Sequence, residues 1–243
     1  MSGTNLCERN EAGLAEAHGT GEPTANSYDA VPYNSHPFPR AHPGHLAAVA
    51  TLFGMKPAPI DCCRVLELGC AGGGNLIPMA LTLPASRFVG VDLSARQIAD
   101  GQKLVGELAL DNIDLRHLNI LDVGRGLGPF DYIVCHGVYS WAPGPVRDKI
   151  LEICARGLAP QGVAFVSYNT YPGWHMNGMI RDMLCFHARR FARPEDRATQ
   201  ARALLDFLAE AAAPEQNAYS RLLTEGLEVF GKVDDSYLLH EYL

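Results

Sequence analysis

The segment VLELGCAGGGN at positions 65–75 is the part of this sequence whose residue types most clearly indicate chemistry. An apolar stretch contains the acidic residue Glu67, and a glycine-rich turn then opens a helical stretch. Glycine lets the backbone turn sharply and approach a ligand closely, where a Cβ atom would collide. The segment therefore indicates a nucleotide-binding turn, for which three types of site have to be compared.

Two of these types disagree with residues in or just after the turn. Gly69 and Gly74 have the separation found in a phosphate-binding loop, but Asn75 stands where that loop needs a lysine to hold terminal phosphates. A dinucleotide fingerprint that starts at Gly72 would place the bulky Ile77 at its third glycine. Both types of site are therefore disfavoured.

The third type fits the turn. The pattern ExGxxxGG, from Glu67 to Gly74, resembles the first motif of class I S-adenosylmethionine-dependent methyltransferases, with Ala71 where the commonest form has glycine. Such a site needs an acidic residue about 20 residues further on, at the end of the next strand, to bind the ribose hydroxyls. Asp92 in FVGVDLS meets this requirement. A lone Asp after a strand is usually a helix cap, and Ser94 could also be one, but the combination with the glycine turn favours a ribose ligand.

Two later segments also follow predicted strands. HLNILDV, which begins at His117, offers Asn119, Ile120 and Asp122 for packing on the adenine and for a polar contact. An ordinary turn would explain any single one of these residues nearly as well. SYNTYPGWH contains Tyr168, Tyr171 and Trp174, whose aromatic faces would attract the sulfonium of the cofactor or a substrate ammonium. Packing on the helices that follow is an equally good explanation.

The segment FDYIVCHGVYSW, which begins at Phe130, should pass the methionine part of the cofactor and form one wall of the methyl-transfer site. Amino-directed DNA methyltransferases have an (Asn/Asp/Ser)-Pro-Pro-aromatic tetrad here, whereas this chain has the sequence HGVY from His136 to Tyr139. DNA base methylation is therefore disfavoured. Cys135 and His136 are neighbours on a strand and point to opposite faces, which favours a core cysteine and a site-lining histidine over a nucleophilic pair.

The elements around these motifs alternate between strand and helix. Strands are predicted at Arg64–Leu68, Arg87–Asp92, Ile113–Leu118, Phe130–Cys135 and Val163–Tyr168. Helices are predicted at Gly44–Phe53, Asn75–Leu83, Ala95–Ala109, Pro145–Gly157, Trp174–Phe191, Glu195–Ala212 and Glu215–Phe230. The pattern predicts an α/β fold with a doubly wound, mainly parallel Rossmann-like sheet, in which ligands bind beyond the carboxyl ends of the strands.

We expect four regions along the chain. These are a flexible tail at 1–26, a proline-rich lid with a helix at 27–60, the cofactor-binding core at 61–173 and a helical extension at 174–243. The last residues, DDSYLLHEYL, have no stop signal, so we expect that a longer protein continues beyond Leu243.

The composition limits the partners. A formal net charge of -7 disfavours a nucleic-acid partner, and no apolar run approaches the length of a membrane span. Seven cysteines without a CxxC pair, and no visible signal peptide, predict a reduced, cytoplasmic protein. His42 and His45 are three residues apart, but no carboxylate or cysteine recurs at ligand spacing, so we expect no metal.

Beyond the glycine turn, the chain resembles a bacterial family that joins a class I methyltransferase domain to a methyltransferase regulatory domain. The resemblance rests on SYDAVPYNSHPFPRAHP from Ser27, on VLELGCAGGGNLIPMA, on CHGVYSW and on SYNTYPGW. Relatives include protein-lysine methyltransferases that modify outer-membrane proteins of intracellular bacteria. Class I sheets normally finish with two further strands, the last antiparallel, for which this chain offers no convincing pair.

The resemblance and the motifs together give candidate site residues. Those expected at the cofactor are Tyr33, Glu67, Gly69, Cys70, Gly73, Asn75, Asp92, Leu93, Asn119, Ile120, His136 and Gly137, with Tyr28 in the lid. Those expected at the substrate are Trp141, Tyr168 and Trp174, and the candidates for catalysis are His136, Tyr139 and Tyr171.

The expected chemistry is in-line transfer of the methyl group from S-adenosylmethionine, leaving S-adenosylhomocysteine. A lysine acceptor must be neutral when it attacks, and burial lowers a lysine pKa. Three functions remain open: N-methylation of protein lysines, N- or O-methylation of a small molecule, and a cofactor-binding module that is inactive without a missing C-terminal part. The sequence does not indicate an oligomeric state.

Overall fold

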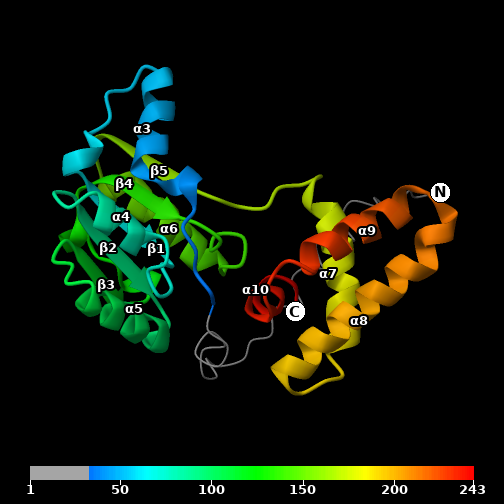
Figure 1. Ribbon diagram of the computed structural model, residues 1–243. Helices are drawn as coiled ribbons and strands as arrows, with labels where there is room; N and C mark the ends of the chain where they lie inside the picture. Colours follow the sequence, from blue (N-terminus) through cyan, green and yellow to red (C-terminus); the bar gives the residue numbers. More distant parts are fainter. Residues whose placement is uncertain (1–32) are drawn as a thin grey trace, which may run out of the picture.

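The computed structural model describes residues 33–243, so the expected tail and Tyr28 lie outside the described residues. Within this range the chain forms an α/β core, drawn from blue to green in Figure 1, and a group of helices beside it, drawn from yellow to red. The segment 33–38 has no regular structure and leads through the short helix η1 (Pro39–Ala41) into α3 (Pro43–Leu52). His42 caps α3, because its Nδ1 accepts a hydrogen bond from the backbone N–H of Gly44.

Five strands form the sheet of the core. They are β1 (Arg64–Leu68), β2 (Arg87–Asp92), β3 (Ile113–His117), β4 (Phe130–Cys135) and β5 (Leu158–Val166). Their order is β3-β2-β1-β4-β5 and all the pairs are parallel. The order reverses between β1 and β4, where open sheets of this type bind their ligands at the carboxyl ends of the strands. The predicted doubly wound, Rossmann-like sheet is confirmed.

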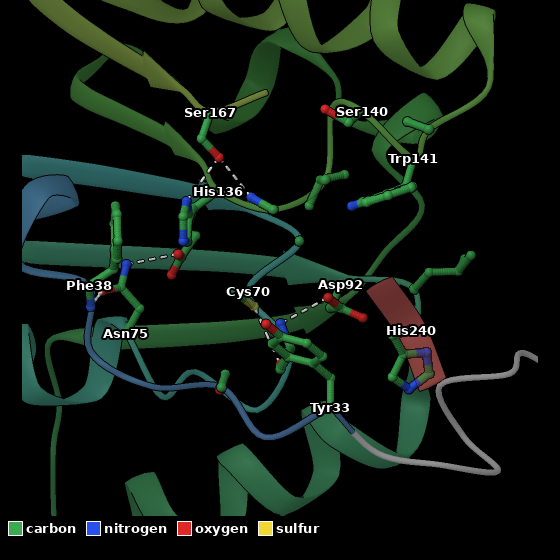
Figure 2. Close-up of a pocket in the computed structure, with 18 of the residues that line it drawn as sticks. Tyr33, Phe38, Cys70, Asn75, Asp92, His136, Ser140, Trp141, Ser167 and His240 are labelled. Carbon is green, nitrogen blue, oxygen red and sulfur yellow. Dashed lines mark hydrogen bonds between the residues drawn. The ribbon is translucent and has the colours of Figure 1, made fainter. Parts of the chain in front are cut away.

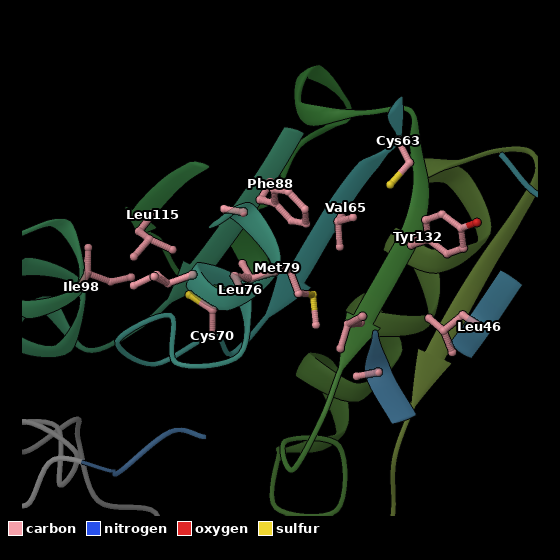
Figure 3. Close-up of a cluster of buried hydrophobic side chains, with 14 residues drawn as sticks. Leu46, Cys63, Val65, Cys70, Leu76, Met79, Phe88, Ile98, Leu115 and Tyr132 are labelled. Atoms are coloured by element: carbon pink, nitrogen blue, oxygen red, sulfur yellow. The ribbon is translucent and has the colours of Figure 1, made fainter. Parts of the chain in front are cut away.

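Helices cover both faces of the sheet because the strand side chains alternate between two apolar layers. On one face α3, α4 (Leu76–Thr82) and α5 (Ala95–Glu107) pack over Val65, Phe88 and Tyr132. Figure 3 shows this layer, with Leu76 and Met79 of α4 and Ile98 of α5 facing the strands. On the other face, α6 (Gly144–Gly157) packs over Leu66 and Ile133.

Short turns of 3-10 helix precede β1 and lie in the connection between β3 and β4. They are η2 (Ile60–Cys62), η3 (Ile120–Asp122) and η4 (Arg125–Leu127). Asn119 starts η3, since its side chain accepts a hydrogen bond of 2.9 Å from the backbone N–H of Leu121.

The C-terminal helices have an apolar core of their own. They are α7 (Trp174–Ala188), α8 (Pro194–Ala212), η5 (Ala213–Glu215), α9 (Ala218–Phe230) and α10 (Asp235–Tyr242). Ile180, Leu184, Leu205 and Leu223 are fully buried in this core. In Figure 1, α10 is the helix of this group that lies nearest the α/β core.

Several predicted boundaries differ from the structure. β5 begins at Leu158 rather than Val163, because a bulge that includes Gln161, with φ +66°, lets the strand continue past Pro160. α9 begins at Ala218 rather than Glu215, because Gln216 adopts φ +46° and interrupts the helix.

α10 was not among the helices predicted from the sequence. Its N-cap is Asp234, whose carboxylate accepts a hydrogen bond from the backbone N–H of Tyr237 at 2.8 Å. None of the helices in residues 33–243 is both long and apolar enough to cross a bilayer.

Candidate active site

A cavity of about 660 Å³ opens at the carboxyl ends of the strands, within the size range of small-molecule sites. Its walls are formed mainly by segment 33–38, by the loops that follow the strands and by α10. Figure 2 shows these walls, with His136 and Asp92 on opposite sides of the space. The cavity therefore lies where the strand order predicts a ligand site.

Most of the residues expected at the site line this cavity. They are Tyr33, Glu67, Gly69, Cys70, Asn75, Asp92, Leu93, Asn119, Ile120, His136, Gly137, Trp141 and Tyr168. Four others do not line it, namely Gly73, Tyr139, Tyr171 and Trp174.

Glu67 contributes a buried carboxyl group to the cavity wall. Its Oε1 accepts a hydrogen bond of 2.8 Å from Asn75 Nδ2, while Asn75 Oδ1 accepts one of 2.9 Å from the backbone N–H of Phe38. Glu67 Oε2 is buried and has no hydrogen-bond partner among the described residues. Burial raises the pKa of Glu67 to about 7, although the hydrogen bond from Asn75 lowers it. A cationic ligand group would satisfy this oxygen and favour the ionised carboxylate.

The glycine turn brings the backbone close to the cavity. Gly69 adopts φ +77°, and a Cβ atom there would lie 2.4 Å from Cγ2 of Val138. Gly73 also adopts φ +77°, but a Cβ there would contact Leu115 and Ile77, so this glycine shapes the turn rather than the cavity. Segment 33–38 is tied to the turn, because Gly74 N–H donates to Ser35 Oγ at 2.9 Å.

Asp92 holds the turn from the end of β2. Its Oδ2 accepts a hydrogen bond of 2.8 Å from the backbone N–H of Ala71, and its Oδ1 accepts one of 2.8 Å from that of Ser94. Ser94 in turn caps α5, since its hydroxyl accepts from the backbone N–H of Gln97 at 3.2 Å. The helix-cap role that competed for Asp92 thus belongs to Ser94, and the Asp92 carboxylate lies in the cavity wall.

His136 lies at the end of the cavity away from Asp92, where its side chain contacts Ser167 and Phe38. Its Nδ1 is 2.9 Å from Ser167 Oγ, and its ring stacks on Phe38 with the centroids 3.8 Å apart. Burial lowers the pKa of His136, so the ring is neutral near pH 7. The neighbouring Cys135 is fully buried on the opposite side, and burial raises its pKa to about 12. The structure therefore separates the two side chains as strand alternation predicts.

Some of the aromatic residues that follow β4 and β5 line the cavity, and others lie outside it. Trp141 lines the cavity and makes an edge contact with Trp174 at 5.8 Å, which links the core to α7. The ring of Tyr139 packs against that of Tyr168, with the ring centroids 5.8 Å apart. Tyr171 is 65% exposed and stacks on His175 outside the cavity.

Several residues that line the cavity were not among the predicted site residues, and those with the clearest contacts are Ser35, Phe38, Ser167, Tyr237 and His240. Ser167 and Phe38 stand in motifs that were recognised, but nothing in the motifs indicates their contacts. Tyr237 and His240 belong to α10, for which the cap residue Asp234 was an available signal.

Metal binding finds no support in the part of the chain that is described. No group of three or more His, Cys, Asp or Glu side chains there is arranged to hold a metal ion.

Several known proteins are similar to this chain in sequence or in structure. A family described as methyltransferase domain matches residues 66–164. Two uncharacterised proteins of Rickettsia prowazekii, RP789 and RP028, are 45% and 43% identical to the chain; the matches cover 90% and 89% of it, and 39% and 87% of those proteins. The solved structure of PKMT2 from Rickettsia typhi in complex with AdoHcy (S-adenosylhomocysteine) has a TM-score of 0.79 and 43% identity. That match covers 87% of this chain and 41% of PKMT2, so the chain spans less than half of two of these three relatives.

Proposed function

This chain belongs to the S-adenosylmethionine-dependent methyltransferase family, and on that premise we propose that it methylates lysine side chains of another protein. One observation carries the proposal that the chain transfers a methyl group. Glu67 and Asp92, at the carboxyl ends of β1 and β2, line the same cavity. The lysine acceptor rests on the 43% identity to PKMT2, a name that stands for protein-lysine methyltransferase.

The residues of the cavity fit the cofactor. The Asp92 carboxylate suits a pair of ribose hydroxyls, and the buried Oε2 of Glu67 suits an ammonium group. We assign Asn119 and Ile120 to the adenine and Gly137 to the methionine part. The absence of a Cβ at Gly69 makes room for the side chain of Val138, which lines the cavity beside it. When bound, S-adenosylmethionine supplies a methyl group that its sulfonium has already activated.

The protein has to position the acceptor and exclude water, because the methyl group is already activated. Trp141 and Tyr168 line the cavity and would surround an acceptor side chain with aromatic faces, which attract an ammonium. Burial there would lower the pKa of a lysine and favour its neutral, attacking form. His136 is neutral near pH 7 and is our candidate to accept the proton that the lysine releases.

The test is methyl transfer from S-adenosylmethionine labelled in its methyl group. The acceptors are a purified bacterial outer-membrane protein, the same protein with its lysines chemically blocked, and a small-molecule extract. We expect label on the unblocked protein alone, on lysine Nζ when its peptides are analysed by mass spectrometry. Label only in small molecules would contradict the lysine acceptor. Binding of S-adenosylhomocysteine without transfer to any acceptor would support the cofactor-binding module instead.

A further inference from the structure

α10 is held firmly by the other C-terminal helices. Its inner side chains Leu238 and Tyr242 are 1% and 5% exposed, and the ring of Tyr242 meets that of Phe230 edge-on at 4.5 Å. Arg202 of α8 adds hydrogen bonds to Asp235 Oδ1 at 2.8 Å and to the carbonyl oxygen of Val233 at 2.9 Å. These contacts fix the position of α10 within the group of C-terminal helices.

The other side of α10 faces the cavity. Tyr237 and His240 are three residues apart, on one face of the helix, and both line the cavity together with Asp92. Figure 2 shows His240 and Tyr33 on the Asp92 side of the cavity, away from His136. This places the α10 side chains at the end to which we assign the ribose.

Segment 33–38 connects α10 to the glycine turn. The ring of Tyr33 lies 6.4 Å from that of Tyr237 and 6.1 Å from that of His240. Asn34 Nδ2 donates a hydrogen bond of 2.8 Å to Asp234 Oδ2 at the N-cap of α10. The same segment receives the hydrogen bond from Gly74 described above. The three parts thus form a continuous wall around this end of the cavity.

We propose that α10 is part of the cofactor site, where Tyr237 and His240 cover the adenosyl end of S-adenosylmethionine with Tyr33. The chemistry supports this assignment, because aromatic side chains stack on purine bases and the Tyr and His side chains also offer polar groups. Cofactor binding then couples the C-terminal helices to the Rossmann-like core. The inference rests on the proposed function, since it assumes an adenosyl ligand.

The experiment is calorimetric titration with S-adenosylhomocysteine and, separately, with adenosine. The variants are Tyr237→Ala and His240→Ala. The matched controls are Tyr219→Ala on α9 and His175→Ala on α7, whose side chains are exposed and do not line the cavity. Thermal unfolding of each variant shows that the chain is folded at the temperature of the titration.

We expect the Kd for S-adenosylhomocysteine to rise about tenfold in each α10 variant, equivalent to about 1.4 kcal/mol, and to stay within about twofold in the controls. Adenosine should lose affinity by the same factor, because α10 covers that part of the molecule. In the wild type, S-adenosylhomocysteine should also slow amide hydrogen exchange in α10.

Two results would overturn the inference. One is an unchanged Kd in folded α10 variants of a chain that binds S-adenosylhomocysteine, which would leave the proposed function standing. The other is a loss of affinity for S-adenosylhomocysteine but not for adenosine, which would place α10 at a different end of the ligand. A wild type that binds neither compound would instead contradict the proposed function.

Discussion

Ser167 Oγ lies 2.9 Å from Nδ1 of His136 and accepts a hydrogen bond of the same length from the backbone N–H of Gly137. One hydroxyl at the end of β5 thereby fixes both the ring and the backbone at the end of β4. These are the residues that we place at the methyl-transfer end of the cavity. Ser167 is therefore a positioning residue in this account, and its effect should be seen through His136.

Replacing Ser167 with alanine should lower the rate of methyl transfer by about tenfold, because the hydrogen bonds that it removes are each worth about 1 kcal/mol. The Kd for S-adenosylhomocysteine should change less, since the residues assigned to the ribose and the ammonium are untouched. Ser167→Thr keeps the hydroxyl and should restore most of the rate. A wild-type rate in Ser167→Ala, together with an unchanged NMR signal from His136, would refute this role.

Replacing Phe38 with alanine should raise the pKa of His136 toward its ordinary value of 6.5. Burial lowers the pKa of His136, and the Phe38 ring stacked on it contributes to that burial. The measurement is an NMR titration in which the signal of His136 is assigned by its loss in His136→Gln. Phe53→Ala is the control, since Phe53 is 85% exposed at the C-terminal end of α3 and does not line the cavity. An equal pKa in the wild type and Phe38→Ala would show that the stack does not shield the ring.

Replacing Glu67 with glutamine should change how stability depends on pH. The pKa of Glu67 is about 7 in the folded chain, against an ordinary value of 4.5. When the pKa of a carboxyl group is higher in the folded state than in the unfolded state, the group stabilises the fold at pH values below the unfolded-state pKa. This contribution to stability is lost as the pH rises through the folded-state pKa, here about 7. Above that pH the cofactor-free glutamine variant should be the more stable, by on the order of 3 kcal/mol. At pH 4 the two should be similar.

The measurement is urea unfolding of the wild type and of Glu67→Gln at pH 4 and at pH 8. Taking the difference in the free energy of unfolding between the two proteins at each pH cancels the contributions of the other titrating groups. Cofactor binding should respond in the opposite direction, because only an ionised Glu67 attracts an ammonium. The variant should therefore bind S-adenosylhomocysteine about tenfold more weakly at pH 8. A stability difference that is the same at both pH values would contradict the buried, raised-pKa carboxyl group.

Replacing Gly69 with alanine should cost more stability than the same change at Gly54. Both glycines have positive φ, of +77° and +82°, so both variants carry a conformational cost of about 1–2 kcal/mol. Only at Gly69 does the new Cβ meet another atom, Cγ2 of Val138 at 2.4 Å, while nothing lies within 4 Å at Gly54. Overpacking adds about 1–3 kcal/mol, and cofactor affinity should fall only in Gly69→Ala. Equal losses of stability in urea unfolding would argue against the contact with Val138.

The sequence could predict the core of this fold because its signals are local. The boundaries of β1, β2 and β4 follow from runs of apolar residues, and Glu67 and Asp92 follow from the glycine turn and the strand after it. β5 was harder to delimit, because Pro160 within it is typical of a loop and only the bulge at Gln161 accommodates it.

The contacts that complete the cavity are not local. Phe38 meets His136 across the fold, and Asn34 meets Asp234 across almost the whole described chain. No spacing in the sequence encodes such pairs, because they depend on how separately formed elements pack. Tyr171, which is conspicuous in its motif, stacks instead on its near neighbour His175, outside the cavity.

The most direct test of the account is a crystal structure of this chain with S-adenosylhomocysteine bound. We predict that the ribose hydroxyls will hydrogen-bond to the Asp92 carboxylate, that the amino group will lie at Oε2 of Glu67, and that the sulfur will face the space beside His136 and Trp141. A ligand bound outside this cavity, or one whose ribose hydroxyls contact neither oxygen of Asp92, would contradict the assignment of the site.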